Sequence, residues 1–205
     1  QALLAYLALQ DHAVSRVRLA GLLWGEMSEE SARANLRLVL NKLKPFAPFL
    51  DISRHEIGLV RSAEVWIDAV AFSQAMGQAE TLDMNALQAT LNLYRGPFLH
   101  DFSVREAPEF ELWIVETREH FQTVALRGLL IAARRAGESG AYGVGVRSAR
   151  QAVVLDPFHE EAHRTLMWML VHAGQRVAAL QQYETFVAVI SEELGIAPAP
   201  ETTQL

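Results

Sequence analysis

Apolar positions at the start of the chain recur with the spacing of two helices. Residues 2–9 form an apolar helix candidate. A second apolar pattern covers residues 16–24, with Ser15 placed as its N-cap and Gly25 at its end. The pattern therefore predicts two helices joined by a short connection.

A third helix follows, with Ser28 or Ser31 as its cap. It covers residues 31–44 and stops at Pro45, which cannot continue a helix. At 100° per residue its apolar side chains share one narrow face, which predicts burial of Ala32, Leu36, Val39, Leu40 and Leu43.

After this helix the helical periodicity is interrupted by short alternating runs. Residues 50–53 and 56–60 flank Arg54 and His55 and indicate a small β-hairpin. Helical spacing returns in residues 68–76. The order is thus three helices, a hairpin and a fourth helix.

Residues 77–81 form the predicted boundary between two domains, and the chain after them has an entirely helical pattern. A loop rich in Gly, Pro and aromatic residues covers 95–107, and Pro108 suits the first turn of the helix after it. The predicted helices are residues 82–94, 108–136, 141–155, 159–172 and 176–194.

This helical part contains an internal repeat. Gly140 and Gly174 lie 34 residues apart, and the same offset pairs Gly145 with Ala179, Val146 with Leu180, and Val153 with Val187. A period of 34 is that of tetratricopeptide-type helical hairpins. The alternative is an ordinary antiparallel bundle whose glycines coincide by chance.

The overall charge of −6 is unfavourable for nucleic-acid binding, but its distribution changes that interpretation. Residues 1–77 carry eight basic and eight acidic side chains, whereas residues 78–205 carry ten and sixteen. Residues 31–50 contain four basic side chains and no acidic one. Local charge determines the field that a phosphate experiences, so the first part can bind DNA.

The polar side of the third helix carries the residue types that bind DNA. Arg33, Arg37, Asn41 and Lys44 form a stripe about 110° from the apolar face, as the 3.6-residue period places them. Arginine and lysine neutralise phosphates, and asparagine can pair with adenine. A basic helix followed by a hairpin is typical of a winged helix-turn-helix. The predicted DNA contacts are Arg33, Asn35, Arg37, Asn41, Lys42 and Lys44, with Arg54 and His55 on the wing.

Several short segments also occur in an order that is specific to one family. In the first part they are Val14-Ser15-Arg16, residues 19–25 (LAGLLWG), Ser31-Ala32-Arg33 and Asn35-Leu36-Arg37. In the second part they are residues 94–99 (YRGPFL), Leu155-Asp156-Pro157, residues 160–164 (EEAHR) and residues 192–195 (EELG). This order resembles the SARP-type activators of antibiotic pathways, in which a winged helix precedes a bacterial transcriptional activator domain.

The resemblance implies a mainly α protein with a winged helix-turn-helix in residues 1–77 and a tetratricopeptide-like domain in residues 78–205. It implies a transcriptional activator that binds promoter DNA with residues 31–44. The helical domain would assist dimerisation or contact RNA polymerase. The family has a small β-sheet before the first helix, and those strands are missing here, so the winged helix is N-terminally incomplete.

A second hypothesis is a protein-interaction module of a larger regulator that does not bind DNA by itself. The acidic second part favours a protein partner over nucleic acid. We expect a cytoplasmic protein without a membrane span, because no apolar run approaches the roughly 20 residues that a bilayer requires.

The segment from His159 to His163 matches HExxH, in which two histidines one turn apart bind zinc and Glu160 is the general base. It follows Asp156-Pro157 directly, so we interpret its acidic residues as first-turn residues that suit the helix dipole. There is no cysteine, GxxxxGK loop or GxSxG elbow. We therefore expect no enzymatic activity, metal or cofactor.

Overall fold

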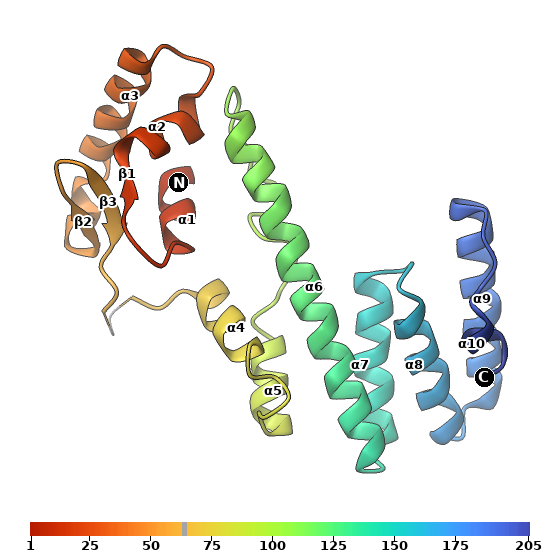
Figure 1. Ribbon diagram of the computed structural model, residues 1–205. Helices are drawn as coiled ribbons and strands as arrows, with labels where there is room; N and C mark the ends of the chain where they lie inside the picture. The colour runs from red at the N-terminus through yellow and green to blue at the C-terminus, as the bar shows by residue number, and fades with distance from the viewer. Residues whose placement is uncertain (63–64) are drawn as a thin grey trace. The chain divides into compact units, whose positions relative to one another are not determined.

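The computed structural model describes residues 1–62 and 65–205, most of them helical (Figure 1). Contacts between Cα atoms divide the chain into two compact units. Unit 1 comprises residues 1–73 and 95–121, and unit 2 comprises residues 74–94 and 122–205. These are packing units, and the sequence boundary after residue 77 stays a prediction.

The first three helices of unit 1 follow the predicted pattern. They are α1 (Ala2–Ala8), α2 (Arg16–Trp24) and α3 (Glu29–Lys42). Ser15 caps α2, since its hydroxyl accepts a hydrogen bond from the Arg18 amide over 3.2 Å. Ser28 caps α3 by accepting from the Ser31 amide over 3.3 Å, which settles the two alternatives for this cap.

The end of α3 lies two residues before the predicted end at Lys44. Lys44 precedes Pro45, and the proline ring disfavours helical backbone in the residue before it. The chain therefore leaves the α-helix after Lys42 and continues as the 3₁₀-helix η1 (Lys44–Phe49), with Pro45 in its first turn.

The hairpin of unit 1 is confirmed and belongs to a sheet of three antiparallel strands. These are β1 (Val14–Ser15), β2 (Leu50–Ile52) and β3 (Glu56–Leu59), in the order β1-β3-β2. Ile57 pairs with both Val14 and Ile52 and is fully buried. The pairing of β1 with β3 attaches the hairpin to the start of α2.

The first turns of α6 (Pro108–Glu138) complete the core of unit 1. Phe110 and Ile114 are fully buried there, and Trp113 packs edge-on against Tyr6 with 4.9 Å between ring centroids. The preceding loop is held by Arg118, whose guanidinium donates to the carbonyl oxygens of Phe98 and Leu99 over 2.7 and 2.6 Å.

Unit 2 consists of helices. The chain enters it within α4 (Asp68–Met76), and α5 (Met84–Leu91) follows. After the second part of α6, the remaining helices are α7 (Tyr142–Leu155), α8 (Glu160–His172), α9 (Arg176–Leu194) and α10 (Pro200–Thr203). The predicted limits of α9 are confirmed, and the short α10 was not predicted.

The 34-residue repeat has a counterpart in the turns of unit 2. Gly140 and Gly174 both adopt left-handed backbone, with φ of 73° and 76°. In each turn the amide after the glycine donates to a carbonyl five residues back, Ala141 to Ala136 and Gln175 to Leu170. This geometry closes a helix with a glycine in the left-handed region. The two turns are therefore equivalent, as helical hairpin repeats require.

Among the residues that the structure describes, no helix combines the length and the apolar character that crossing a membrane requires.

Candidate nucleic-acid interface

The apolar face of α3 packs into unit 1 as the sequence predicts. Ala32 and Leu36 are buried, with 4% and 2% of their surface exposed. The other three predicted residues, Val39, Leu40 and Leu43, are partly buried against the same core. This packing fixes which side of α3 faces outward.

The outward side of α3 carries exposed cations and an exposed amide. Arg37, Asn41 and Lys42 are exposed, and so is Lys44 at the start of η1. Their side chains make no hydrogen bond or ion pair with any residue in the described part of the chain. These groups are thus available to a ligand in solution.

Two of the predicted contacts on α3 have partners within unit 1. Arg33 forms an ion pair with Glu29 one turn earlier, with 2.5 Å between nitrogen and oxygen. The Asn35 side chain is half-buried and donates to the Met27 sulfur over 3.3 Å. A ligand would compete with Glu29 for Arg33, and Asn35 is oriented by Met27.

The wing residues Arg54 and His55 lie exposed in the turn between β2 and β3. Ser53 shapes this turn, because its hydroxyl accepts from the amides of His55 and Glu56 over 3.2 and 2.9 Å. Arg16 ties the turn to α2: its amide donates to the His55 carbonyl over 2.8 Å, and its Nε donates to the Ser53 carbonyl over 3.1 Å.

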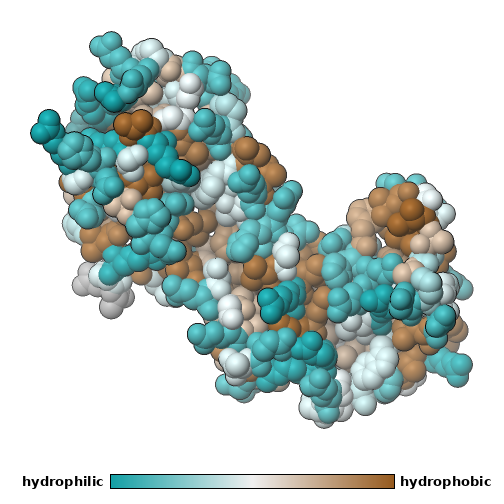
Figure 2. Space-filling view, viewed as in Figure 1, coloured by the Kyte–Doolittle hydropathy of each residue, from teal (hydrophilic) through white to brown (hydrophobic). Residues whose placement is uncertain are grey.

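Charge is unevenly distributed along α3. Glu29 and Glu30 occupy its first turn, where carboxylates suit the helix dipole. Lys42 lies in the last turn, and Lys44 follows it. The positive potential of this surface therefore increases toward the C-terminal end of α3. On the face of unit 1 shown in Figure 2, hydrophilic side chains predominate, with apolar side chains scattered among them.

The HExxH segment at the start of α8 is committed to local structure. Nδ1 of His159 caps the helix by accepting from the Ala162 amide over 3.3 Å. The carboxylate of Glu160 accepts from the Ala199 amide over 2.8 Å and from the Thr202 hydroxyl, so it holds the start of α10. Neither residue is directed at a common metal position.

His163 is 2% exposed, and both of its ring nitrogens have partners. Because a carbonyl only accepts, Nε2 carries the proton and donates to Pro157 over 2.9 Å, and Nδ1 accepts from the Gln182 amide over 2.9 Å. Burial lowers the pKa of His163 below its ordinary value of 6.5. Among the residues that the structure describes, no three His, Cys, Asp or Glu side chains are grouped as metal ligands.

The equivalent turns and paired helices of unit 2 define a helical repeat protein. The sequence model described as "Bacterial transcriptional activator domain" matches residues 67–205, more than half of the chain. The chain therefore belongs to this family of transcriptional activators. The match agrees with the resemblance found in the second part of the sequence.

A solved structure supports the fold over both units. The chain is similar to that in "Mycobacterium tuberculosis EmbR in complex with low affinity phosphopeptide", with a TM-score of 0.73 and 19% sequence identity. The similarity covers 99% of this chain and 56% of that chain. At this identity it shows the shared fold. No curated protein matches the chain.

Proposed function

We propose that this chain is the part of a transcriptional activator that binds promoter DNA, with the exposed side of α3 and the wing as its contact surface. The observation that carries the proposal is the exposure of Arg37, Lys42, Lys44 and Arg54 without acidic partners in the described part of the chain. The buried face of the same helix holds these side chains outward on a packed unit.

The chemistry of this surface suits a duplex better than a protein groove. Cations that bind phosphates release condensed counterions, which favours binding and makes it depend on salt. Asn41 adds a group that can pair with a base edge, and Arg54 and His55 extend the surface to the wing. Arg37, Asn41 and Lys44 are the contacts that we weight most, because Arg33 already pairs with Glu29.

Unit 2 supplies the protein contacts in this proposal. Arrays of paired helices present extended surfaces to other proteins, and the acidic balance of residues 78–205 disfavours DNA there. We propose dimerisation or contact with RNA polymerase as its role, in the cytoplasm. The protein would act by binding, without enzymatic activity.

Salt-dependent binding tests the DNA contact. The full chain is titrated against a short mixed-sequence duplex by fluorescence anisotropy at several salt concentrations. Replacing Arg37 and Lys44 with alanine removes two phosphate contacts, so the slope of log K against log salt flattens by about 1.8. The matched control replaces Arg147 and Arg150, two exposed cations of α7, and leaves affinity and slope unchanged.

The same titration separates the second hypothesis. If the Arg37→Ala/Lys44→Ala variant binds like the parent chain, with an equal slope, these residues do not contact DNA. If the parent chain itself shows no salt-dependent duplex binding, the interaction-module hypothesis replaces DNA binding by this chain. Its support on the page is the acidic helical part alone.

A further inference from the structure

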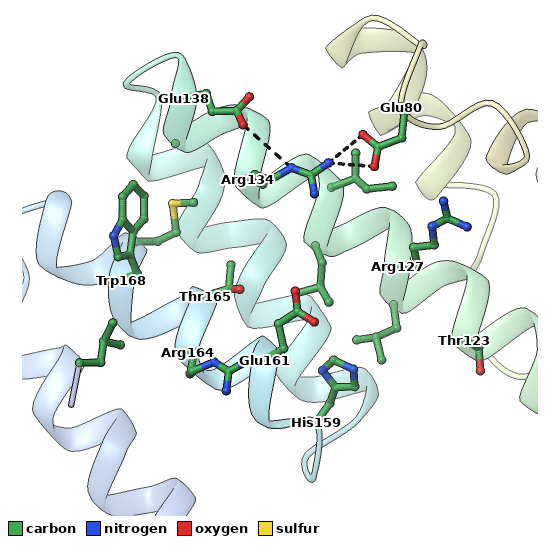
Figure 3. A pocket seen from close by; sticks show the side chains of 16 residues that line it. Glu80, Thr123, Arg127, Arg134, Glu138, His159, Glu161, Arg164, Thr165 and Trp168 are labelled. Atoms are coloured by element: carbon green, nitrogen blue, oxygen red, sulfur yellow. Dashed lines mark hydrogen bonds and ion pairs between the residues drawn. The ribbon is translucent and has the colours of Figure 1, made fainter. Parts of the chain in front are cut away.

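Unit 2 contains a groove of about 710 Å³ between α6 and α8 (Figure 3). Leu130 and Ile131 line it from α6, and Trp168 and Met169 line it from α8. Its charged side chains are Arg127, Arg134, Arg164, Glu80, Glu138 and Glu161, and Thr123, His159 and Thr165 add polar groups. The groove is thus apolar with a charged rim.

Trp168 is an exposed aromatic wall of this groove, whereas its neighbour Met169 is 2% exposed. The Trp168 ring lies against Gly137, where an added Cβ would stand 2.8 Å from Cζ3. On its other side it stacks on His172, with 3.8 Å between ring centroids. A large aromatic surface, 38% exposed and held in one orientation, is the kind of residue that dominates protein interfaces.

The charges of the rim are not all neutralised within the chain. Arg134 is bound by Glu80 over 2.7 Å and lies 4.0 Å from Glu138, as Figure 3 shows. Arg127 and Arg164 form no ion pair or side-chain hydrogen bond with the residues described. Glu161 lies in the first turn of α8, where the helix dipole stabilises its charge. The unsatisfied groups of the rim are therefore mainly cationic.

We propose that this groove binds an extended acidic peptide segment of another protein, with a bulky apolar side chain on Trp168 and a carboxylate on Arg164. Arg127, from the opposite wall, would pair with a second acidic residue. The inference rests on the proposed protein-binding role of unit 2 and gives that partner a chemistry. Three carboxylates in the lining disfavour nucleic acid as the occupant.

Helix geometry sets the spacing in the peptide. Arg164 and Trp168 are four residues apart on α8, so they lie about 6 Å apart along its axis. An extended peptide advances about 3.3 Å per residue, and its alternate side chains point to the same side. The apolar and acidic residues of the ligand therefore lie two positions apart.

The test uses the full chain and fluorescein-labelled synthetic peptides in a Gly/Ser background. The peptides contain Leu-x-Glu, Glu-x-Leu, Leu-x-Gln or Leu-x-Lys, and anisotropy reports their binding. One of the two acidic peptides should bind about tenfold more tightly than Leu-x-Gln, because a charge-assisted hydrogen bond is lost in the amide. Arg164→Gln should abolish that discrimination, and Trp168→Ala should weaken both peptides.

Arg150→Gln is the matched control, because Arg150 is exposed on α7 outside the groove. Circular dichroism verifies that each variant is folded, and Arg164→Gln alone decides the outcome if Trp168→Ala is not. Equal binding of the glutamate, glutamine and lysine peptides, or no binding by any, overturns the proposal. Self-association abolished by Arg164→Gln, seen by analytical ultracentrifugation, overturns it in favour of a second copy.

Failure here is distinguishable from failure of the proposed function. Duplex binding is measured through Arg37 and Lys44 in unit 1, and peptide binding through Arg164 and Trp168 in unit 2. A chain that binds duplex but no acidic peptide contradicts the groove inference alone. A chain that binds the peptide but no duplex contradicts the DNA contact alone.

Discussion

Gly145 offers a perturbation for which helix propensity and packing predict opposite signs. It is buried within α7, and a Cβ added there would lie 2.5 Å from the sulfur of Met169. Ordinary contact begins at 3.4 Å, so the sulfur would have to move by about 0.9 Å. On its other side Met169 meets Gly137, where a Cβ would stand only 2.8 Å from its terminal methyl. The side chain is therefore confined between two glycines.

The magnitude follows from two opposing terms. Replacing a glycine by alanine inside a helix contributes about 0.8–1.0 kcal/mol of stability. Forcing an extra methyl group into a packed core costs about 1–3 kcal/mol. Because Met169 has no free side to move toward, we expect the cost to exceed the gain. Gly145→Ala should lower the free energy of unfolding by about 1 kcal/mol.

Urea denaturation followed by circular dichroism measures this change, with Gly143→Ala as the matched control in the same helix. Nothing lies within 4 Å of a Cβ at Gly143, so that variant should gain up to about 1 kcal/mol. Met169→Ala should cost less in the Gly145→Ala background than in the parent, by at least about 0.5 kcal/mol. A Gly145→Ala variant as stable as Gly143→Ala would refute the confinement of Met169.

Two further predictions concern backbone strain and pH. Glu106 is exposed with φ of 60°, so Glu106→Gly should raise the midpoint of thermal unfolding, by about 1 kcal/mol of stability, whereas Glu106→Ala should not. Burial lowers the pKa of folded His163, so the unfolded chain binds a proton first as pH falls below 6.5. Its contribution to stability is full above that pH and is lost below it; a His163→Gln variant with the same loss of stability between pH 7.5 and 5.5 as the parent, and as a His172→Gln control, would contradict this.

Helix ends were the most predictable part of the fold, because local residues determine them. The Ser15 cap, the break at Pro45 and the glycine turns at 140 and 174 all act within one or two turns of their own position. β1 escaped prediction because two residues carry no period, and only pairing with β3 makes them a strand. Local signals thus determined the helices, and long-range pairing completed the sheet.

The candidate interface was predictable as a face but not as a set of free groups. Helical periodicity correctly placed Leu36 inside and Arg37 outside. It could not show that Glu29 pairs with Arg33 or that Met27 accepts a hydrogen bond from Asn35, since both depend on side-chain conformations. The structure therefore narrows the predicted contacts more than it adds to them.

The HExxH match shows why residue spacing alone does not define a metal site. Zinc requires the free lone pairs of two histidines and an acid that activates water. Here the lone pair of His159 caps a helix, that of His163 accepts from Gln182, and Glu160 holds α10. Each polar atom that the motif would supply to a metal already has a structural partner. Zinc binding would therefore require breaking a helix cap, a buried hydrogen bond and the anchor of α10, which favours a structural role for this segment.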